Sequence, residues 1–319
     1  MITLSDLHAA QARLKGVTNR SHLIQFPLCA EDPRKLYLKA ENQQPIGAFK
    51  LRGAYNKIAS LPEHERKRGV ISYSSGNHAQ GVAYAARALG VKSVIVMPNN
   101  APQIKREATA RLGAEIVIVG PGSDERKVKA EALAAEHGYA VVPPYNDEHI
   151  IAGQGTIGLE ILEELPEVEA VFAPVGGGGL ISGVAAAIKL SNPKVKIIGV
   201  EPELAADAQA SFRSGKVVQF PAEQVSRTLA DGLRTQSIGP INFEHIRAYV
   251  DDIITVSEAE IRQATKYLCE NPATVAEPSG AVSLAAFIFH ATELPKTGVN
   301  VAIISGGNIE PAMLDELRR

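Results

Sequence analysis

The sequence lacks tryptophan, has only 5% aromatic residues, and has two cysteines among 319 residues. Cys29 and Cys269 lie far apart with no CxxC spacing, which predicts two buried apolar side chains in a reducing compartment rather than a disulfide or a zinc site. Neither sign of charge is in excess, since 33 basic residues face 35 acidic ones for a net charge of −2. Nucleic-acid binding depends on clustered Lys and Arg, so we expect no nucleic-acid partner.

Long hydrophobic runs are also missing. The longest, residues 281–291, is too short to span a bilayer, and the N-terminus lacks the charged and apolar segments of a secretory signal. We therefore expect a soluble, cytoplasmic protein with no membrane partner. The length allows one large or two modest domains with a core that needs no disulfide. Glycine, by contrast, is abundant with 27 residues, and its positions need an explanation.

Short apolar runs alternate with helical patterns along the whole chain. The runs predict strands buried on both faces, at residues 36–38, 70–73, 94–97, 115–119, 140–142, 170–173, 196–200, 253–256 and 301–304. Ala-rich segments with apolar residues three and four apart predict helices between them, for example at 79–89, 103–112, 124–137 and 180–190. This alternation predicts the α/β class, with parallel sheets covered by helices.

Within residues 69–145, strand and helix patterns alternate regularly, and each helical pattern ends near a glycine: Gly90, Gly113 or Gly138. Their length suits a small doubly wound unit. We therefore predict two doubly wound domains, a small inserted one at 69–145 and a large one built from 1–68 and 146–319, with a cleft between them. Ligands of open α/β sheets bind beyond the carboxyl ends of the strands, so the glycine loops there are candidate sites.

Residues 153–158 (Gly-Gln-Gly-Thr-Ile-Gly) fit the GxGxxG pattern of dinucleotide-binding loops. The preceding residues 148–152 make a poor buried strand, and no acidic residue stands about twenty positions further on, as such loops require. The pattern favours a structural use, a tight entry into a helix, over a dinucleotide site.

A stronger candidate is the run of four glycines at 176–179, which follows a strand pattern and precedes a helical one. Backbone N–H groups in this position can surround an anion at the positive end of a helix dipole. No Gly-Lys-Ser/Thr follows, which excludes a Walker loop. Such a run between polar segments would be a flexible linker, but between strand and helix it favours a phosphate site.

Two further loops follow predicted strands. Residues 74–78 (Ser-Ser-Gly-Asn-His) offer hydroxyls and an amide at a helix start, which suits a substrate carboxylate, although an ordinary N-cap serine fits equally well. Residues 305–308 (Ser-Gly-Gly-Asn) alone would be a turn. Together the loops predict a phosphorylated cofactor and a small polar substrate.

Lys50 has apolar neighbours in the segment Ala48-Phe49-Lys50-Leu51-Arg52-Gly53-Ala54. A lone lysine is usually a solvated surface group. A lysine that is partly desolvated near a cationic ring would have a lowered pKa and form a Schiff base.

Residues 47–54, 74–78, 176–180 and 305–308 together resemble the pyridoxal-phosphate enzymes of the tryptophan synthase β-type fold, fold type II. They are most similar to the group of serine/threonine dehydratases and serine racemases. The motifs have the group's order and spacing over nearly the whole chain. The resemblance implies pyridoxal phosphate as cofactor and a β-hydroxy amino acid as substrate.

The resemblance also implies roles for single residues at the cofactor. Lys50 would hold pyridoxal phosphate as a Schiff base and remove the Cα proton, with Phe49 beside it. Asn77 would bind the ring 3′-oxygen and Ser305 the ring nitrogen; a neutral hydroxyl there favours elimination of a β-substituent over transamination. Backbone N–H groups would bind the phosphate, from Gly176, Gly177, Gly178, Gly179 and Leu180.

Residues expected near the substrate are Ser74, Ser75, Gly76 and His78 at its carboxylate, with Arg126 and Tyr145 facing it from the small domain. Ser75 distinguishes two activities, because threonine dehydratases of the group have Ser-Ala-Gly-Asn-His here and serine racemases have Ser-Ser-Gly-Asn-His, whose second serine is an acid/base opposite the lysine. The next residues, 79–81 (Ala-Gln-Gly), resemble the dehydratases. Ala48 replaces a serine common in the group, at a position that carries no chemistry.

Two bases on opposite faces allow inversion at Cα, whereas one base and a β-hydroxyl leaving group give elimination. The leading hypothesis is an L-serine/L-threonine ammonia-lyase that yields 2-keto acid and ammonia. Serine racemase, within a bifunctional site or alone, and threo-3-hydroxyaspartate ammonia-lyase stay open as alternatives. A sensor that kept the fold without catalysis is disfavoured, since it needs no Schiff-base lysine.

Residues 201–207 also resemble the group's divalent-cation loop. Glu201, the carbonyl of Ala205 and Asp207 would hold Mg²⁺ or Ca²⁺ in a structural or activating role through oxygen ligands, although acidic residues after a strand are often only solvated. The group is commonly dimeric, which implies a homodimer. The sequence ends at Arg319, soon after the last motif, and we expect no feedback control at a C-terminal regulatory domain.

Overall fold

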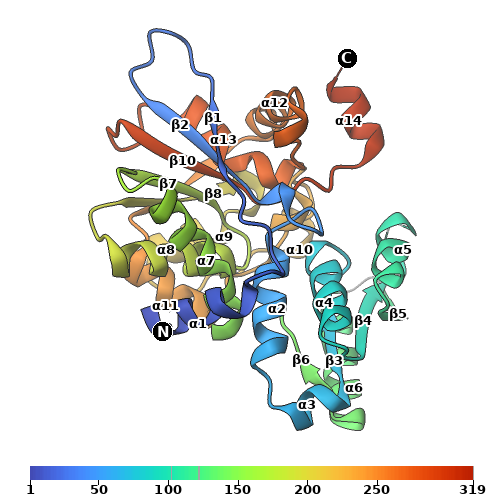
Figure 1. Ribbon diagram of the computed structural model, residues 1–319. Helices are drawn as coiled ribbons and strands as arrows, with labels where there is room; N and C mark the ends of the chain where they lie inside the picture. Colours follow the sequence, from blue (N-terminus) through green and yellow to red (C-terminus); the bar gives the residue numbers. More distant parts are fainter. Residues whose placement is uncertain (102, 121–122, 319) are drawn as a thin grey trace.

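The structure is a computed structural model that describes residues 1–101, 103–120 and 123–318. Its strands form two sheets that lie side by side (Figure 1). The large sheet has the order β1 (Leu23–Phe26), β2 (Lys35–Ala40), β10 (Val299–Ile304), β7 (Ala170–Pro174), β8 (Lys196–Pro202) and β9 (Asp252–Val256). The small sheet has the order β5 (Glu115–Val119), β4 (Ser93–Pro98), β3 (Val70–Tyr73) and β6 (Ala140–Val141).

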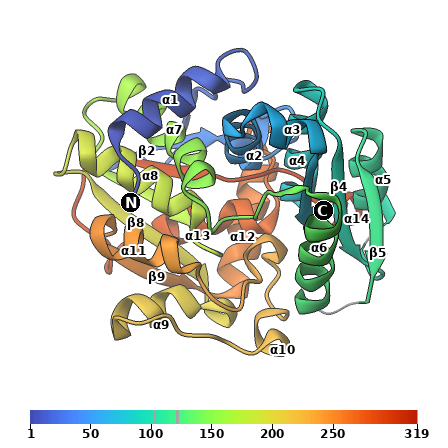
Figure 2. The same cartoon turned by 90° about the horizontal axis from the view of Figure 1, so that it is seen from below.

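Helices connect the strands and cover both sheets. They are α1 (Leu4–Leu14), α2 (Lys50–Ser60), α3 (Glu63–Arg68), α4 (Asn77–Ala88), α5 (Gln103–Arg111), α6 (Ser123–His137), α7 (Glu148–Glu164), α8 (Gly179–Ser191), α9 (Asp207–Ser214), α10 (Ala222–Val225), α11 (Pro240–Tyr249), α12 (Glu258–Cys269), α13 (Pro278–Phe289) and α14 (Pro311–Leu317). Short 3₁₀ turns are η1 (Glu41–Gln43), η2 (Glu203–Ala205), η3 (Asp231–Leu233) and η4 (Pro272–Thr274). Seen from below, the small sheet with α5 and α6 stands to one side of the large sheet (Figure 2). None of the helices described is both long and apolar enough to cross a bilayer.

The prediction of an α/β fold with parallel sheets is confirmed, because every strand pair but one is parallel. The exception is β1, which pairs antiparallel with β2 at the edge of the large sheet and was not predicted. It is short and only partly buried, so it lacks the apolar signal of the inner strands.

The strand β5 is also an edge strand, and Ile118 is 45% exposed there, so the prediction that β5 is buried on both faces was wrong. All strands of the small sheet lie within residues 69–145, and the exact domain boundaries stay a prediction.

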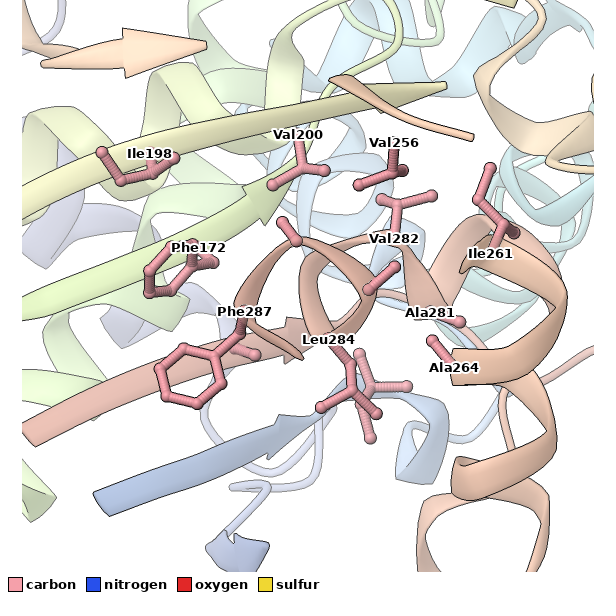
Figure 3. Packing of buried hydrophobic residues seen from close by; sticks show 14 of the residues in the cluster. Phe172, Ile198, Val200, Val256, Ile261, Ala264, Ala281, Val282, Leu284 and Phe287 are labelled. Atoms are coloured by element: carbon pink, nitrogen blue, oxygen red, sulfur yellow. The ribbon is translucent and has the colours of Figure 1, made fainter. Parts of the chain in front are cut away.

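The core of the large sheet lies on both of its faces. Phe172 of β7 packs edge-on against Phe287 of α13, with ring centroids 5.7 Å apart (Figure 3). Its neighbour Val171 joins the apolar cluster under α7 and α8 on the opposite face. Successive strand residues thus bury against different helices, as expected for a parallel sheet covered on both sides.

Residues 153–158 lie inside α7, so the predicted tight entry into a helix was wrong. The helix begins at Glu148 after Asp147, whose side chain accepts from the N–H groups of His149 and Ile150. A Cβ on Gly153 would lie 2.6 Å from the carbonyl oxygen of Arg52. The glycines therefore allow α7 to approach its neighbouring helices closely.

The cysteine prediction holds for Cys269, which is buried, but was wrong for Cys29, which is exposed in the turn after β1.

Candidate active site

Two segments far apart in the sequence pair at the carboxyl end of the large sheet. The N–H of Phe49 donates to the carbonyl of Ser305 (3.0 Å), and the N–H of Gly307 donates to the carbonyl of Gly47 (2.9 Å). Ala48 and Gly306 form an isolated bridge between them. This pairing fixes Lys50, the first residue of α2, close to the loop that follows β10.

Lys50 is the only lysine among the described residues whose pKa is found lowered. Loss of solvent around Nζ lowers the pKa of this amine to about 8. The Nζ atom donates to the carbonyl of Pro144 (2.8 Å) and lies 5.2 Å from the ring centroid of Phe49. About a tenth of this lysine is therefore neutral, and nucleophilic, at pH 7, far more than for a free lysine.

A buried ion cluster holds α2 in place. The guanidinium of Arg52 binds Glu41 (2.8 Å) and Glu160 (2.6 Å), and Lys39 binds Glu160 on the other side (2.6 Å). These residues come from β2, η1, α2 and α7. Sequence reasoning missed this cluster, because nothing in the sequence shows which distant charges will meet. It anchors the helix that begins with Lys50.

Residues 74–78 connect β3 to α4 beside Lys50. The hydroxyl of Ser74 accepts from the N–H of Gly76 (3.3 Å), and the described residues give the hydroxyl of Ser75 no hydrogen-bond partner. A Cβ on Gly76 would meet nothing within 4 Å. The loop therefore presents hydroxyls and backbone to open space, as a ligand-binding loop needs.

His78 has a different surrounding from the rest of this loop. Its side chain is buried, and its Nε2 lies 3.0 Å from the carbonyl of Val142. Burial, and then the charge of Lys50, lower the pKa of the imidazole to about 3. The ring is neutral, and its single N–H is used by Val142, so a role for His78 at a substrate carboxylate would fall to its backbone N–H.

The glycine run 176–179 connects β7 to α8. Gly178, the N-cap, has φ +91°, and no side chain caps the helix. A Cβ on Gly177 would collide with the ring of Tyr145. The carbonyl of Gly177 is fixed by the side chain of Asn242 (2.6 Å), whereas in the described chain no group accepts from the N–H groups of residues 176–178. With Leu180 buried in the first turn, the loop fits an anion at a helix N-terminus.

The remaining predicted residues lie around these loops. Ser305 is buried, and its hydroxyl donates to the carbonyl of Ser279 over 3.3 Å. Burial raises the pKa of Tyr145 to about 12, so its phenol stays neutral. Arg126 is half-buried on α6, which packs against β3 and β4, and burial lowers its pKa. The structure thus brings Lys50 and Ser305 together, with Tyr145 against the glycine run, and places Arg126 on the small-sheet side.

Two acidic residues near the site were not predicted. Glu277 is buried before α13 and accepts from Nδ2 of Asn77 (2.6 Å). Asp231 in η3 binds Lys105 of α5 (2.7 Å), which joins the two sheet units. A lone acidic residue before the apolar run 278–289 was the only available signal for Glu277, and its partner is 200 positions away.

The predicted cation loop lies after β8. The carboxylate of Glu201 accepts from the N–H groups of Ala208 (3.0 Å) and Gln209 (2.7 Å). Both carboxylate oxygens of Asp207 are buried without a donor of good geometry in the described chain. Burial raises the pKa of Asp207 to about 7, and burial together with the nearby Asp207 raises the pKa of Glu201. No group of three or more His, Cys, Asp or Glu side chains suited to a metal occurs among the described residues.

A partly neutral lysine and a helix start with free N–H groups are connected through the neighbouring residues Pro144 and Tyr145. An enzyme that binds a phosphorylated carbonyl cofactor needs both features. Comparison with known families agrees, since residues 18–306 match the pyridoxal-phosphate dependent enzyme family. The chain belongs to this family, and its predicted membership is confirmed.

Similar proteins narrow the choice of reaction. The chain is 48% identical over 319 residues to an L-threonine ammonia-lyase of Thermotoga maritima, covering 99% of this chain and 78% of that protein. It is 42% identical over 309 residues to an L-threo-3-hydroxyaspartate ammonia-lyase of Saccharomyces cerevisiae, covering 97% and 94% of the two chains. The structure of maize serine racemase superposes with a TM-score of 0.92 at 36% identity, covering 98% and 95%.

Proposed function

We propose that this protein is an ammonia-lyase that uses pyridoxal phosphate to convert L-threonine or L-serine into a 2-keto acid and ammonia. The observation that carries the proposal is the pairing of residues 47–49 with 305–307, which sets a lysine of lowered pKa beside Ser305. The similarity to an L-threonine ammonia-lyase over nearly the whole chain supports the choice of reaction.

The residues present fit the cofactor. Pyridoxal phosphate supplies an electron sink for the charge that develops when the substrate loses its Cα proton. The free N–H groups of residues 176–178 and the start of α8 would bind the phosphate. Lys50, which needs little energy to be neutral, would hold the cofactor and move the Cα proton of the substrate. The hydroxyl of Ser305, turned from its long contact with the carbonyl of Ser279, would be a neutral donor to the ring nitrogen, which favours loss of the β-hydroxyl.

The substrate carboxylate would bind at residues 74–78. The hydroxyls of Ser74 and Ser75 and the backbone at the start of α4 face the open space beside Gly76. An anion at a helix N-terminus is stabilised by the dipole and the free N–H groups. Tyr145 and Arg126 would close this site from the small-sheet side.

Serine racemisation is the second candidate, and Ser75 is the residue that favours it. Its hydroxyl has no protein partner in the described chain, so it is available as a second acid/base. The similarity to maize serine racemase supports this alternative, and the relative that acts on threo-3-hydroxyaspartate supports that substrate as a third.

Three finer features belong to the same proposal. Glu201, the carbonyl of Ala205 and Asp207 would hold Mg²⁺ or Ca²⁺, because a cation would neutralise two buried carboxylates, and that of Asp207 has no donor of good geometry in the described chain. Its role would be structural or activating. A homodimer and a cytoplasmic location are proposed from the resemblance to the group.

The test is to supply the purified protein with L-threonine, L-serine and threo-3-hydroxyaspartate and to measure keto acid, ammonia and D-serine together. We expect keto acid from L-threonine or L-serine, and a loss of about 10²–10⁴-fold in Lys50→Ala. D-serine that disappears in Ser75→Ala while keto acid persists would establish the racemase activity. Keto acid formation that survives in Lys50→Ala would overturn the proposal.

A further inference from the structure

The side-chain amide of Asn77 is held from both sides. Its Oδ1 accepts from Nδ2 of Asn308 (2.7 Å), and its Nδ2 donates to Oε1 of Glu277 (2.6 Å). The three residues come from α4, from the loop after β10 and from the residue before α13. They therefore join three segments at the carboxyl end of the large sheet.

The orientation of this amide follows from a backbone carbonyl. Oxygen and nitrogen of a side-chain amide are assigned from their hydrogen-bond partners. The nitrogen of Asn308 also donates to the carbonyl of Ile46 (2.9 Å), which can only accept. Nδ2 of Asn308 is thereby fixed, so the atom of Asn77 that faces it must be the oxygen. The other atom of the Asn77 amide must then be the nitrogen, and Glu277 must accept from it.

One N–H of the Asn77 side-chain amide has no acceptor among the described residues. An amide nitrogen carries two donors, and Glu277 takes one of them. Gly306 lies beside the pair, because a Cβ there would collide with Oε1 of Glu277 and lie 3.1 Å from Nδ2 of Asn77. The absence of a side chain at position 306 is thus a condition for the contact between Glu277 and Asn77.

We propose that Glu277 and Asn308 are positioning residues that fix the amide of Asn77 so that its remaining N–H is presented to the ring oxygen of the cofactor. The inference rests on the proposed function, because Asn77 is expected at that oxygen only in a pyridoxal-phosphate enzyme. Without Glu277, the amide would lose its acceptor and rotate. With its oxygen turned toward the ring oxygen, two acceptors would repel each other.

The charge of Glu277 gives this arrangement a dependence on pH. Three groups face it: Asn77 of α4, Asp231 of η3 and Lys105 of α5. Burial, and then the charge of Asp231, raise the pKa of Glu277 to about 7, while Asn77 and Lys105 lower it. A hydrogen bond to a carboxylate is stronger than one to a neutral acid. The hydrogen bond from Asn77 to Glu277 should therefore weaken as the pH falls through about 7, because Glu277 then becomes protonated.

The experiment measures cofactor binding by the full chain rather than turnover. Pyridoxal phosphate is titrated into wild type, Glu277→Ala, Glu277→Gln and Asn77→Ala, and into the double variant of Asn77→Ala with Glu277→Ala, across a range of pH. The dissociation constant is recorded with the ratio of the visible to the near-ultraviolet absorbance band, which reports the protonation state at the ring oxygen. Asp251→Asn is the control, because it also neutralises a partly buried carboxylate but lies before the amino end of β9, where it binds Lys189 and Lys196.

We expect Glu277→Ala to weaken cofactor binding about tenfold, as loss of a charge-assisted hydrogen bond would. Glu277→Gln should bind within about threefold of wild type, because its amide oxygen can accept, and should lose the pH dependence of the band ratio near 7. In the Asn77→Ala background, Glu277→Ala should cost nothing further in cofactor affinity. Asp251→Asn should keep the wild-type band ratio and its pH dependence even where it lowers thermal stability.

Two results would overturn the inference. One is an equal loss from Glu277→Ala with and without Asn77, which would mean that Glu277 acts on packing alone. The other is a wild-type affinity and pH profile in Glu277→Ala. Failure of the proposed function has a different signature, since the wild-type protein would then bind no pyridoxal phosphate or show the same visible band in Lys50→Ala.

Discussion

The Nζ atom of Lys50 lies 2.8 Å from the carbonyl oxygen of Pro144. Lys50 begins α2, whereas Pro144 belongs to the segment that leads from β6 to α7. The same segment supplies the carbonyl of Val142 to His78 and the ring of Tyr145 to the glycine run. The chain that connects the two sheet units therefore contacts Lys50, His78 of the loop at 74–78 and Gly177 of the glycine run.

The pKa of Lys50 predicts how fast the apoprotein captures its cofactor. Burial lowers this pKa from about 10.4 for a free lysine to about 8, and only the neutral amine attacks an aldehyde. The rate of capture should rise with pH and level off above about 8, as followed by the growth of visible absorbance after mixing. A midpoint near the value of free lysine would contradict the desolvation of Nζ.

Alanine at position 177 should distort the glycine run at 176–179. A Cβ there would collide with the ring of Tyr145, so we expect Gly177→Ala to lower the free energy of unfolding by about 1–3 kcal/mol and to weaken cofactor binding. Urea denaturation without cofactor measures the first effect. Gly76→Ala is the matched control, since its Cβ would meet nothing within 4 Å; its stability should stay within about 0.5 kcal/mol of wild type. Equal losses in both variants would show that the contact with Tyr145 is not the cause.

Short-range signals in the sequence predicted most of the fold. The inner strands β7, β8 and β10 are continuous apolar runs, and α4, α5, α6 and α8 were predicted within two residues of their ends. The edge strand β1 and the interior of α7 were missed for physical reasons. β1 is half solvated, and the glycines of α7 imitate a loop motif while their actual role is to let α7 pack closely against α2 and α8.

The same distinction holds for the site. Lys50, Ser75 and the glycine run lie in short contiguous motifs, so their residue types alone suggested their chemistry. Glu277 and Asp231 carry no motif. Their importance comes from contacts with Asn77 and Lys105, which only the folded chain creates. Partners of this kind depend on how distant elements pack, and a single sequence does not show that.

The ion pair between Lys105 and Asp231 should stabilise the contact between the two sheet units. Nζ of Lys105 lies 2.7 Å from Asp231, whose side chain is 41% exposed. Such an exposed pair contributes little, so Lys105→Ala should raise KM by up to about fivefold with a smaller effect on kcat, and should remove part of the salt dependence of KM. Lys127→Ala, which breaks an ion pair within α6, is the control and should leave KM unchanged. A fall in kcat alone would argue against a role in holding the two units together at the substrate site.

The raised pKa of Asp207 leads to a prediction about how the stability of the protein depends on pH with and without a divalent cation. Its pKa is raised to about 7 by burial, against about 3.9 in an unfolded chain. Between these values the folded state holds a proton that the unfolded state releases, so this group's contribution to stability falls as the pH rises through that window. A bound cation would replace the proton. Mg²⁺ or Ca²⁺ should therefore raise Tm more at about pH 8 than at about pH 5.5.

The variant Asp207→Asn distinguishes cation binding at this carboxylate from other causes of pH-dependent stability. The amide carries no charge to bury, so the variant should lose less stability than wild type as the pH rises toward about 8 without cation, and its Tm should not respond to Mg²⁺. Glu203→Gln is the control, because Glu203 lies in η2 of the same loop but is exposed; it should keep the wild-type response. If Mg²⁺ shifts Tm equally in wild type and Asp207→Asn, the cation binds elsewhere, since only a ligand of the folded state at this carboxylate links the two responses.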